Sequence, residues 1–177
     1  MPRVPAPAST GGAGRQKSGS RPSSSCEGSM VELAPDFDEF FGSLIAHGVE
    51  FLVVGAYALA YHGAPRYTGD IDVFLKPTTE NAMRLLDALS AFGFPPTNLR
   101  PEQVIEPTRV IQMGVEPVQI HVMSDISGVT WDEAWAGHVD ARCGSHELPF
   151  IGRAEFIRNK RAAGRLKDLA DIEAIGG

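Results

Sequence analysis

The chain has 177 residues and a mass of 19.0 kDa, long enough for one sizeable core and short for two complete domains. Hydrophobic residues make up 43% and charged residues 21%, which is typical of a globular protein, and no apolar run approaches the roughly 20 residues of a membrane span. Cys26 and Cys143 are too few for a disulfide framework and lack the paired spacing of a zinc site. We therefore expect a reducing, cytoplasmic setting.

Charge divides the chain into two parts. Residues 1–29 hold four basic residues against one acidic residue, so their net charge is +3, while residues 30–177 have a net charge of −9. The first part is rich in Pro, Gly and Ser and poor in aliphatic residues, so we expect a disordered tail over 1–29 and a single domain over 30–177. An acidic domain disfavours non-specific binding along nucleic acid, which needs a basic face.

The first half of this domain alternates helix and strand patterns. Apolar residues at helical spacing predict a helix from Asp36 to Gly48, whose inner face would consist of Phe37, Phe40, Phe41, Leu44 and Ile45. The apolar run 50–54 predicts a buried strand, broken by Gly55 and followed by a short helix that ends at Gly63. Residues 70–75 predict a second strand, which enters the core.

The second half adds a hairpin and more helices. We expect, in chain order, a helix capped by Thr78 that ends near Phe92, a hairpin of strands 109–113 and 118–123, a short helix opened by the Thr130–Glu133 capping box, a strand at 147–151, and helices at about 153–162 and 165–175. The apolar residues expected to close the core from the last two helices are Phe156, Ile157, Leu166, Leu169, Ile172 and Ile175. This mixture favours an α/β or α+β layered fold with a small mixed sheet flanked by helices.

The most informative residues are two acids on the predicted strand 70–75. Asp70 and Asp72 are two positions apart, so a strand projects both carboxylates from one face while Ile71 and Val73 point into the core. The two negative charges repel each other unless a divalent cation lies between them, and hard oxygen ligands suit Mg²⁺ or Mn²⁺. The alternative is that both acids are merely solvated.

A glycine turn precedes these acids. Gly55 and Ala56 lie between an apolar strand and a helix start, where small residues let backbone N–H groups approach a phosphate. Together with Asp70 and Asp72, this turn resembles the nucleotidyltransferase superfamily with the polymerase-β-like fold. The hallmark of that superfamily is an apolar residue, Gly, then Gly or Ser, and an acid-x-acid strand after a gap of about ten residues.

A narrower resemblance covers nearly everything after Asp36. Small bacterial nucleotidyltransferases of the abortive-infection and toxin–antitoxin (AbiEii-like) group carry a His-Gly-x-Pro-Arg-x-Thr segment before the acids. The chain matches that segment with His62, Gly63, Pro65, Arg66 and Thr68. It is also similar to the group in the segments GVTWDEAW at 128–135, PFI at 149–151 and NKRAAGRLKDLADIEAI at 159–175.

The resemblance implies a metal-dependent transfer of a nucleoside monophosphate from an NTP to an acceptor. Asp70 and Asp72 would hold Mg²⁺ or Mn²⁺. The residues expected to contact the nucleotide are Gly55, Ala56, Tyr57, Arg66, Thr68, Lys160, Arg165 and Lys167. For Arg66 a structural ion pair is an equal alternative, and for Lys160, Arg165 and Lys167 the alternative is a solvated charge on a helix.

The chain departs from the superfamily pattern at two positions. Ala56 stands where Gly or Ser is usual, and His121 stands on the strand 118–123 where relatives have an Asp that supplies a third carboxylate. His121 could act as a general base, or as a ligand for a softer metal such as Mn²⁺ or Zn²⁺. Asp125 has the same strand parity if that strand continues.

Two classes of function follow. The first is an enzyme with Asp70, Asp72 and His121 as catalytic residues, acting on a protein or RNA acceptor, with a cognate toxin or antitoxin as a partner. Its acidic body makes RNA the less favoured acceptor and favours a protein or small molecule. The second is a degenerate module that binds nucleotide or neutralises a partner without turnover. A surface for docking a partner on the helices after Arg153 is compatible with both.

Overall fold

The computed structural model describes residues 33–95, 97–116 and 118–177, so the tail predicted over 1–29 lies outside the described residues. The helices are α1 (Pro35–Ala46), α2 (Gly55–Tyr61), α3 (Thr79–Ala91), α4 (Pro101–Val104), α5 (Trp131–Ala136), α6 (Arg153–Ala163) and α7 (Leu166–Ala174). The strands are β1 (Phe51–Val54), β2 (Asp70–Leu75), β3 (Val110–Val115), β4 (Val118–Met123), β5 (Val139–Cys143) and β6 (His146–Phe150). No helix in these ranges is both long and apolar enough to cross a membrane.

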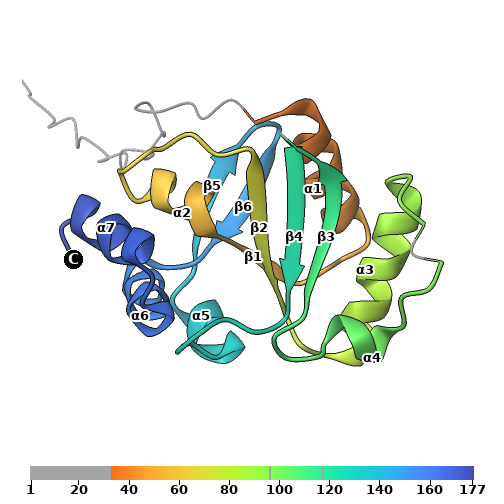
Figure 1. Cartoon of the computed structure of the whole chain (residues 1–177). Coiled ribbons are helices and arrows are strands. Elements are labelled where there is room, and N and C mark those ends of the chain that lie inside the picture. Colours follow the sequence, from red (N-terminus) through yellow and green to blue (C-terminus); the bar gives the residue numbers. More distant parts are fainter. Residues whose placement is uncertain (1–32, 96, 117) are drawn as a thin grey trace, which may run out of the picture.

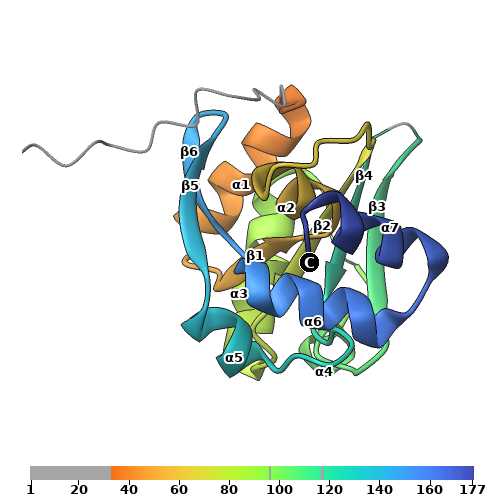
Figure 2. The same ribbon diagram turned by 90° about the vertical axis from the view of Figure 1, so that its left-hand side faces the viewer.

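The strands form one mixed sheet in the order β3-β4-β2-β1-β6-β5 (Figure 1). The β2–β4 and β1–β6 pairs are parallel and the other neighbouring pairs are antiparallel. Two views at right angles show α1, α3 and α4 on one face and α2, α6 and α7 on the other (Figures 1 and 2). The α/β layered fold expected from the sequence, with a mixed sheet flanked by helices, is confirmed.

Helices cover both faces of the sheet, so its central strands bury apolar side chains. All four residues of β1 are buried, and so are Ile71 and Val73 of β2, which point away from the two aspartates. On the α1 side the helix contributes Phe37, Phe40, Phe41 and Leu44, as predicted. The same helical face was expected to include Ile45, and this is wrong, since its side chain is 46% exposed.

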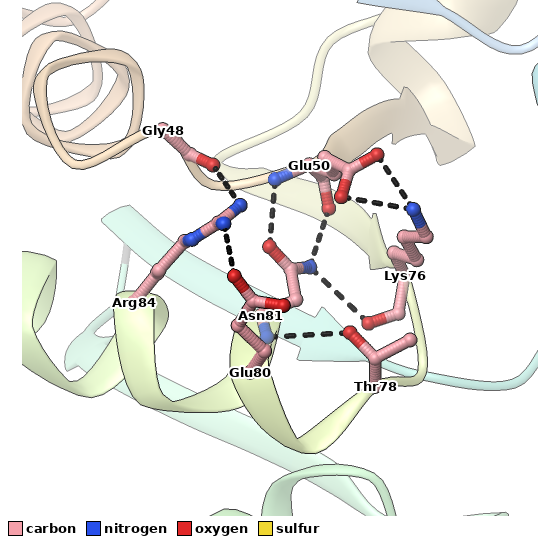
Figure 3. A network of polar contacts seen from close by, with 7 residues as sticks. All are labelled: Gly48, Glu50, Lys76, Thr78, Glu80, Asn81 and Arg84. Carbon is pink, nitrogen blue, oxygen red and sulfur yellow. Dashed lines mark hydrogen bonds and ion pairs between the residues drawn. The ribbon is translucent and has the colours of Figure 1, made fainter.

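A buried amide ties α3 to the sheet. The side chain of Asn81 accepts a hydrogen bond from the Glu50 backbone N–H at 2.8 Å and donates to the backbone carbonyls of Glu50 and Lys76 at 2.8 and 3.2 Å (Figure 3). Its backbone N–H donates to the Thr78 hydroxyl, so Thr78 caps α3 as predicted. The Lys76–Glu50 ion pair closes the same network. The start of β1 and the end of β2 are thus fixed to one helix.

The structure corrects the sequence analysis in three further places. Strand β5 and the short helix α4 were not predicted. Leu166 and Leu169 do not close the core, because they are 88% and 50% exposed. Helix α7 instead turns Asp168, Asp171 and Ile172 inward. Its docking face is therefore mainly acidic.

Candidate functional site

Three neighbouring strands place a row of polar side chains on one face of the sheet. Asp72 on β2 lies opposite His121 on β4, and His121 lies opposite Gln112 on β3. All three line a cavity of about 670 Å³, which Asp70 joins from two residues earlier on β2. Period-2 geometry therefore does bring both aspartates to one side, which is the side covered by α6 and α7.

The start of β2 is held by a local turn. The Thr68 hydroxyl accepts a hydrogen bond from the Asp70 backbone N–H at 3.2 Å. This contact fixes the backbone where the first carboxylate emerges, and Thr68 itself lines the cavity. The turn explains the position of Thr68, and the nucleotide contact expected from the sequence stays a prediction.

Gly55 packs directly against Asp72. Its φ is +65°, in the left-handed region that favours glycine, and a Cβ atom there would lie 2.0 Å from Asp72 Oδ2. Ala56 also lines the cavity. The Tyr57 side chain lies instead in the core, edge-on to Phe37, where burial raises the pKa of its phenol to about 12. Any nucleotide contact from Tyr57 is therefore left to its backbone.

His121 is hydrogen-bonded to the second aspartate. Its Nδ1 lies 3.0 Å from Asp72 Oδ1. Because an ionised carboxylate only accepts hydrogen bonds, Nδ1 carries a proton, and in the neutral ring Nε2 holds the lone pair. Strand β4 ends at Met123, so the strand does not continue to Asp125, although Asp125 also lines the cavity.

The two carboxylates have the chemistry that a hard divalent cation requires. Asp70 and Asp72 supply carboxylate oxygens on one side of the cavity. Within the described ranges no three His, Cys, Asp or Glu side chains group into a ready metal site. Mg²⁺ usually binds one or two carboxylates and completes its shell with water and substrate phosphates, so two carboxylates suffice for Mg²⁺ or Mn²⁺. The same set is too small for a closed structural zinc site.

Four basic residues also line the cavity and are here called its basic wall. Arg66, from the segment between α2 and β2, and Arg165, from the α6–α7 junction, both line the cavity with Lys160 and Lys167. Arg66 Nε lies 3.3 Å from Asp171 Oδ1, so Arg66 forms the structural ion pair that was the alternative to a nucleotide contact. The same residue also lines the cavity. Lys160 is only 5% exposed, which excludes the solvated alternative for this residue.

Asp168, which lies behind this wall, is ionised. Although burial alone would raise it, the pKa of Asp168 is held at about 2 by hydrogen bonds from Arg165 and Lys160. The hydrogen bond to Asp168 in turn raises the pKa of Arg165, and the negative charge of Asp72 adds to this shift. Sequence reasoning missed Asp168 and Asp171, although their i, i+3 spacing beside Lys160 and Arg165 was an available signal.

His62 lies outside the cavity lining. Its Nε2 is 2.9 Å from the Ile151 carbonyl oxygen, and its ring packs near Tyr61 and Phe156. Burial lowers the pKa of this imidazole, and a neutral ring donates to the carbonyl from Nε2. His62 therefore anchors the end of α2 to the segment that enters α6, and its part in the motif is explained by packing.

Comparison with solved structures identifies the class of fold. A protein from Thermotoga maritima described as a nucleotidyltransferase shares 15% identity over 77% of this chain and 88% of its own, with a TM-score of 0.51. The lincosamide antibiotic adenylyltransferase LnuA, solved with lincomycin bound, shares 8% identity over 82% of this chain and 97% of its own, with a TM-score of 0.50. The chain thus has the nucleotidyltransferase fold expected from its motifs.

The comparisons by sequence add no narrower assignment. No protein-family model matches the chain, and no curated protein matches it. The resemblance to the abortive-infection and toxin–antitoxin group therefore stays a prediction.

Proposed function

We propose that the protein is a metal-dependent nucleotidyltransferase, which transfers a nucleoside monophosphate from an NTP to an acceptor and releases pyrophosphate. One observation carries this proposal: Asp70 and Asp72 line a single cavity together with Arg66 and Arg165. Carboxylates that can share a divalent cation therefore lie in the same cavity as cations that attract the triphosphate. The nucleotidyltransferase fold agrees with this reading.

The chain's own residues would bind and orient the nucleotide. Arg66 and Arg165 would hold its phosphates, since guanidinium groups make charge-assisted, bidentate contacts with phosphate oxygens. Gly55 leaves room beside Asp72, where a side chain would displace the carboxylate. Asp70 and Asp72 would hold Mg²⁺ or Mn²⁺, which offsets the charge that develops on the phosphate oxygens.

His121 would take the proton of the acceptor. In the reaction the acceptor hydroxyl oxygen bonds to the α-phosphorus, and the bond from that phosphorus to the bridging oxygen of pyrophosphate breaks. The hydroxyl proton moves to His121 Nε2, whose lone pair is left available by the Nδ1 hydrogen bond to Asp72. Asp72 thereby orients the ring as well as binding the metal.

The acceptor is a hydroxyl group of a protein or a small molecule. Residues 30–177 have a net charge of −9, which leaves RNA as the less favoured acceptor. LnuA is an adenylyltransferase of a lincosamide antibiotic, so small hydroxyl compounds belong in the search. A cognate toxin or antitoxin is the protein partner that the motif resemblance suggests.

A second candidate is a module that binds nucleotide without turnover. The observation in its favour is His121 itself, which stands where a third carboxylate is usual and is tied to Asp72 Oδ1. With one Asp72 oxygen engaged, the site offers less negative charge to a metal ion than three carboxylates would. The protein would then act as a nucleotide sensor or a neutralising partner.

The test uses the four α-labelled NTPs with Mg²⁺ or Mn²⁺ and measures both pyrophosphate release and label transferred to protein or small hydroxyl compounds. We expect turnover that is lost in Asp70→Asn and retained in Asp87→Asn, a matched change at an exposed position of α3. Binding of every NTP without turnover, with or without His121→Asp, would contradict the enzyme. Turnover by the His121→Asp variant alone would establish the second candidate.

A further inference from the structure

Lys160 is a buried cation in a wall that faces a cavity. Its ammonium lies 2.8 Å from Asp168 Oδ1 and 2.8 Å from Asp171 Oδ2. Its side chain also lies over the Phe156 ring, with Nζ 5.4 Å from the ring centre. Two of its three N–H donors are thus engaged by carboxylates, which leaves it poorly suited to grip a phosphate directly.

Each of these carboxylates bridges Lys160 to an arginine. Asp171 contacts Lys160 through Oδ2 and Arg66 Nε through Oδ1. Asp168 contacts Lys160 through Oδ1 and Arg165 Nε through Oδ2, the latter at 2.6 Å. Lys160 is therefore the centre of a five-residue chain of charges that ends in a guanidinium group on either side.

The two guanidinium groups come from segments far apart in sequence. Arg66 precedes the β2 strand and Arg165 lies between α6 and α7, yet both line the same cavity as Asp72. Arg66 uses only its Nε for the pair with Asp171, so its two terminal amino groups are not engaged by that carboxylate. The cluster of three cations and two carboxylates keeps a net charge of +1.

We propose that Lys160 is a positioning residue that, through Asp171 and Asp168, sets Arg66 and Arg165 as a two-pronged site for a linear polyphosphate. This inference rests on the proposed function, and it replaces the direct nucleotide contact expected of Lys160. Without the ammonium the two buried carboxylates repel each other and draw both guanidinium groups inward, away from the cavity.

The test is a double-mutant cycle on binding of inorganic tripolyphosphate, measured calorimetrically on the whole chain at low ionic strength. We expect Lys160→Met to raise Kd about tenfold in the native background and only about threefold in the Arg66→Gln background, because there its effect passes through Arg165 alone. Lys167→Met is the matched control. Lys167 lines the same cavity and makes no ion pair within the described part of the chain, so it should raise Kd by the same factor in both backgrounds.

Three results would overturn the proposal: no binding of tripolyphosphate, no effect of Lys160→Met, or an equal effect of Lys160→Met in both backgrounds. Circular dichroism checks that each variant is folded at the assay temperature. If Lys160→Met does not fold, Asp171→Asn replaces it in the same cycle, since it releases Arg66 while leaving the Lys160–Asp168 pair. Tripolyphosphate has no nucleoside to transfer, so a failure of the nucleotidyltransferase assay leaves this test intact.

Discussion

Replacing Gly55 with alanine tests the geometry on which the candidate site depends. The new Cβ would lie 2.0 Å from Asp72 Oδ2 and 2.8 Å from Asp72 Cγ, so the carboxylate must move. The backbone contributes a separate cost, because a φ of +65° in a non-glycine residue costs about 1–2 kcal/mol. Displacing packed atoms adds about 1–3 kcal/mol. We therefore expect Gly55→Ala to lower the free energy of unfolding by about 2–5 kcal/mol.

Gly48 provides a matched control for the backbone cost. Its φ is +64°, and a Cβ added there would meet nothing within 4 Å. Gly48→Ala should therefore cost only about 1–2 kcal/mol. The difference between the two variants isolates the contact with Asp72, since both replacements change the unfolded chain in the same way. Urea denaturation followed by circular dichroism measures both free energies.

A binding measurement separates displacement of the carboxylate from a general loss of stability. At a temperature where both variants are folded, Gly55→Ala should weaken Mn²⁺ binding and Gly48→Ala should not. Equal losses of stability in the two variants would refute the reasoning, because the Asp72 carboxylate would then not lie over Gly55. Unchanged Mn²⁺ binding by Gly55→Ala would refute the role of Asp72 as a metal ligand.

Three further outcomes follow from local contacts. The pKa of Asp168 is about 2 in the folded protein against 3.8 for an ordinary Asp. Its ionisation therefore contributes about 2 kcal/mol to the free energy of unfolding above pH 4, and this contribution is lost as the pH falls toward 2. In acid unfolding curves, Asp168→Asn should lack this pH-dependent loss of stability. Thr108 has a φ of +65°, so Thr108→Gly should raise the free energy of unfolding by about 0.5–1 kcal/mol in urea denaturation. Thr130→Ala should lower the same quantity by about 1 kcal/mol, because it removes the cap of α5.

Periodicity located the elements whose apolar residues face the core. The run 50–54 became β1 and the alternation at 70–75 became β2, because both strands bury aliphatic side chains. Periodicity missed β5 because this strand buries few apolar side chains. Asp140 and Arg142 of that edge strand are exposed and only Ala141 is buried, so no apolar run marks it.

Periodicity failed on α7 because ion pairs override the apolar pattern there. Leu166 and Leu169 favoured an inward apolar face, yet Asp168 and Asp171 turn inward to meet Lys160. A carboxylate is buried only where a cation neutralises it, and that cation lies on the preceding helix. The packing of α6 against α7 determines which cation each carboxylate meets, and no pattern within a single helix specifies that packing.

Some pairs of site residues could be brought together from the sequence alone, and others could not. Asp70 and Asp72 could be paired from sequence, because strand parity is a local property. The contact of Asp72 with His121 requires β2 and β4 to be neighbours, although two helices and another strand separate them in the chain. Local spacing therefore nominated the residues, and only the topology brought them together.

The net charge of the whole domain repels a polyanionic substrate, whereas the arginines of its cavity attract one. Residues 30–177 have a net charge of −9, but Arg66 and Arg165 lie within the cavity, and charges at contact distance outweigh those beyond a Debye length of about 8–10 Å. Under the proposed function, a compact polyphosphate would thus bind between these arginines and a cation held by Asp70 and Asp72. An extended RNA would continue past the cavity over a domain whose net charge repels it. Few of its phosphates would then contact basic residues. Added salt should therefore weaken transfer to RNA far less than it weakens the binding of RNA along a basic track.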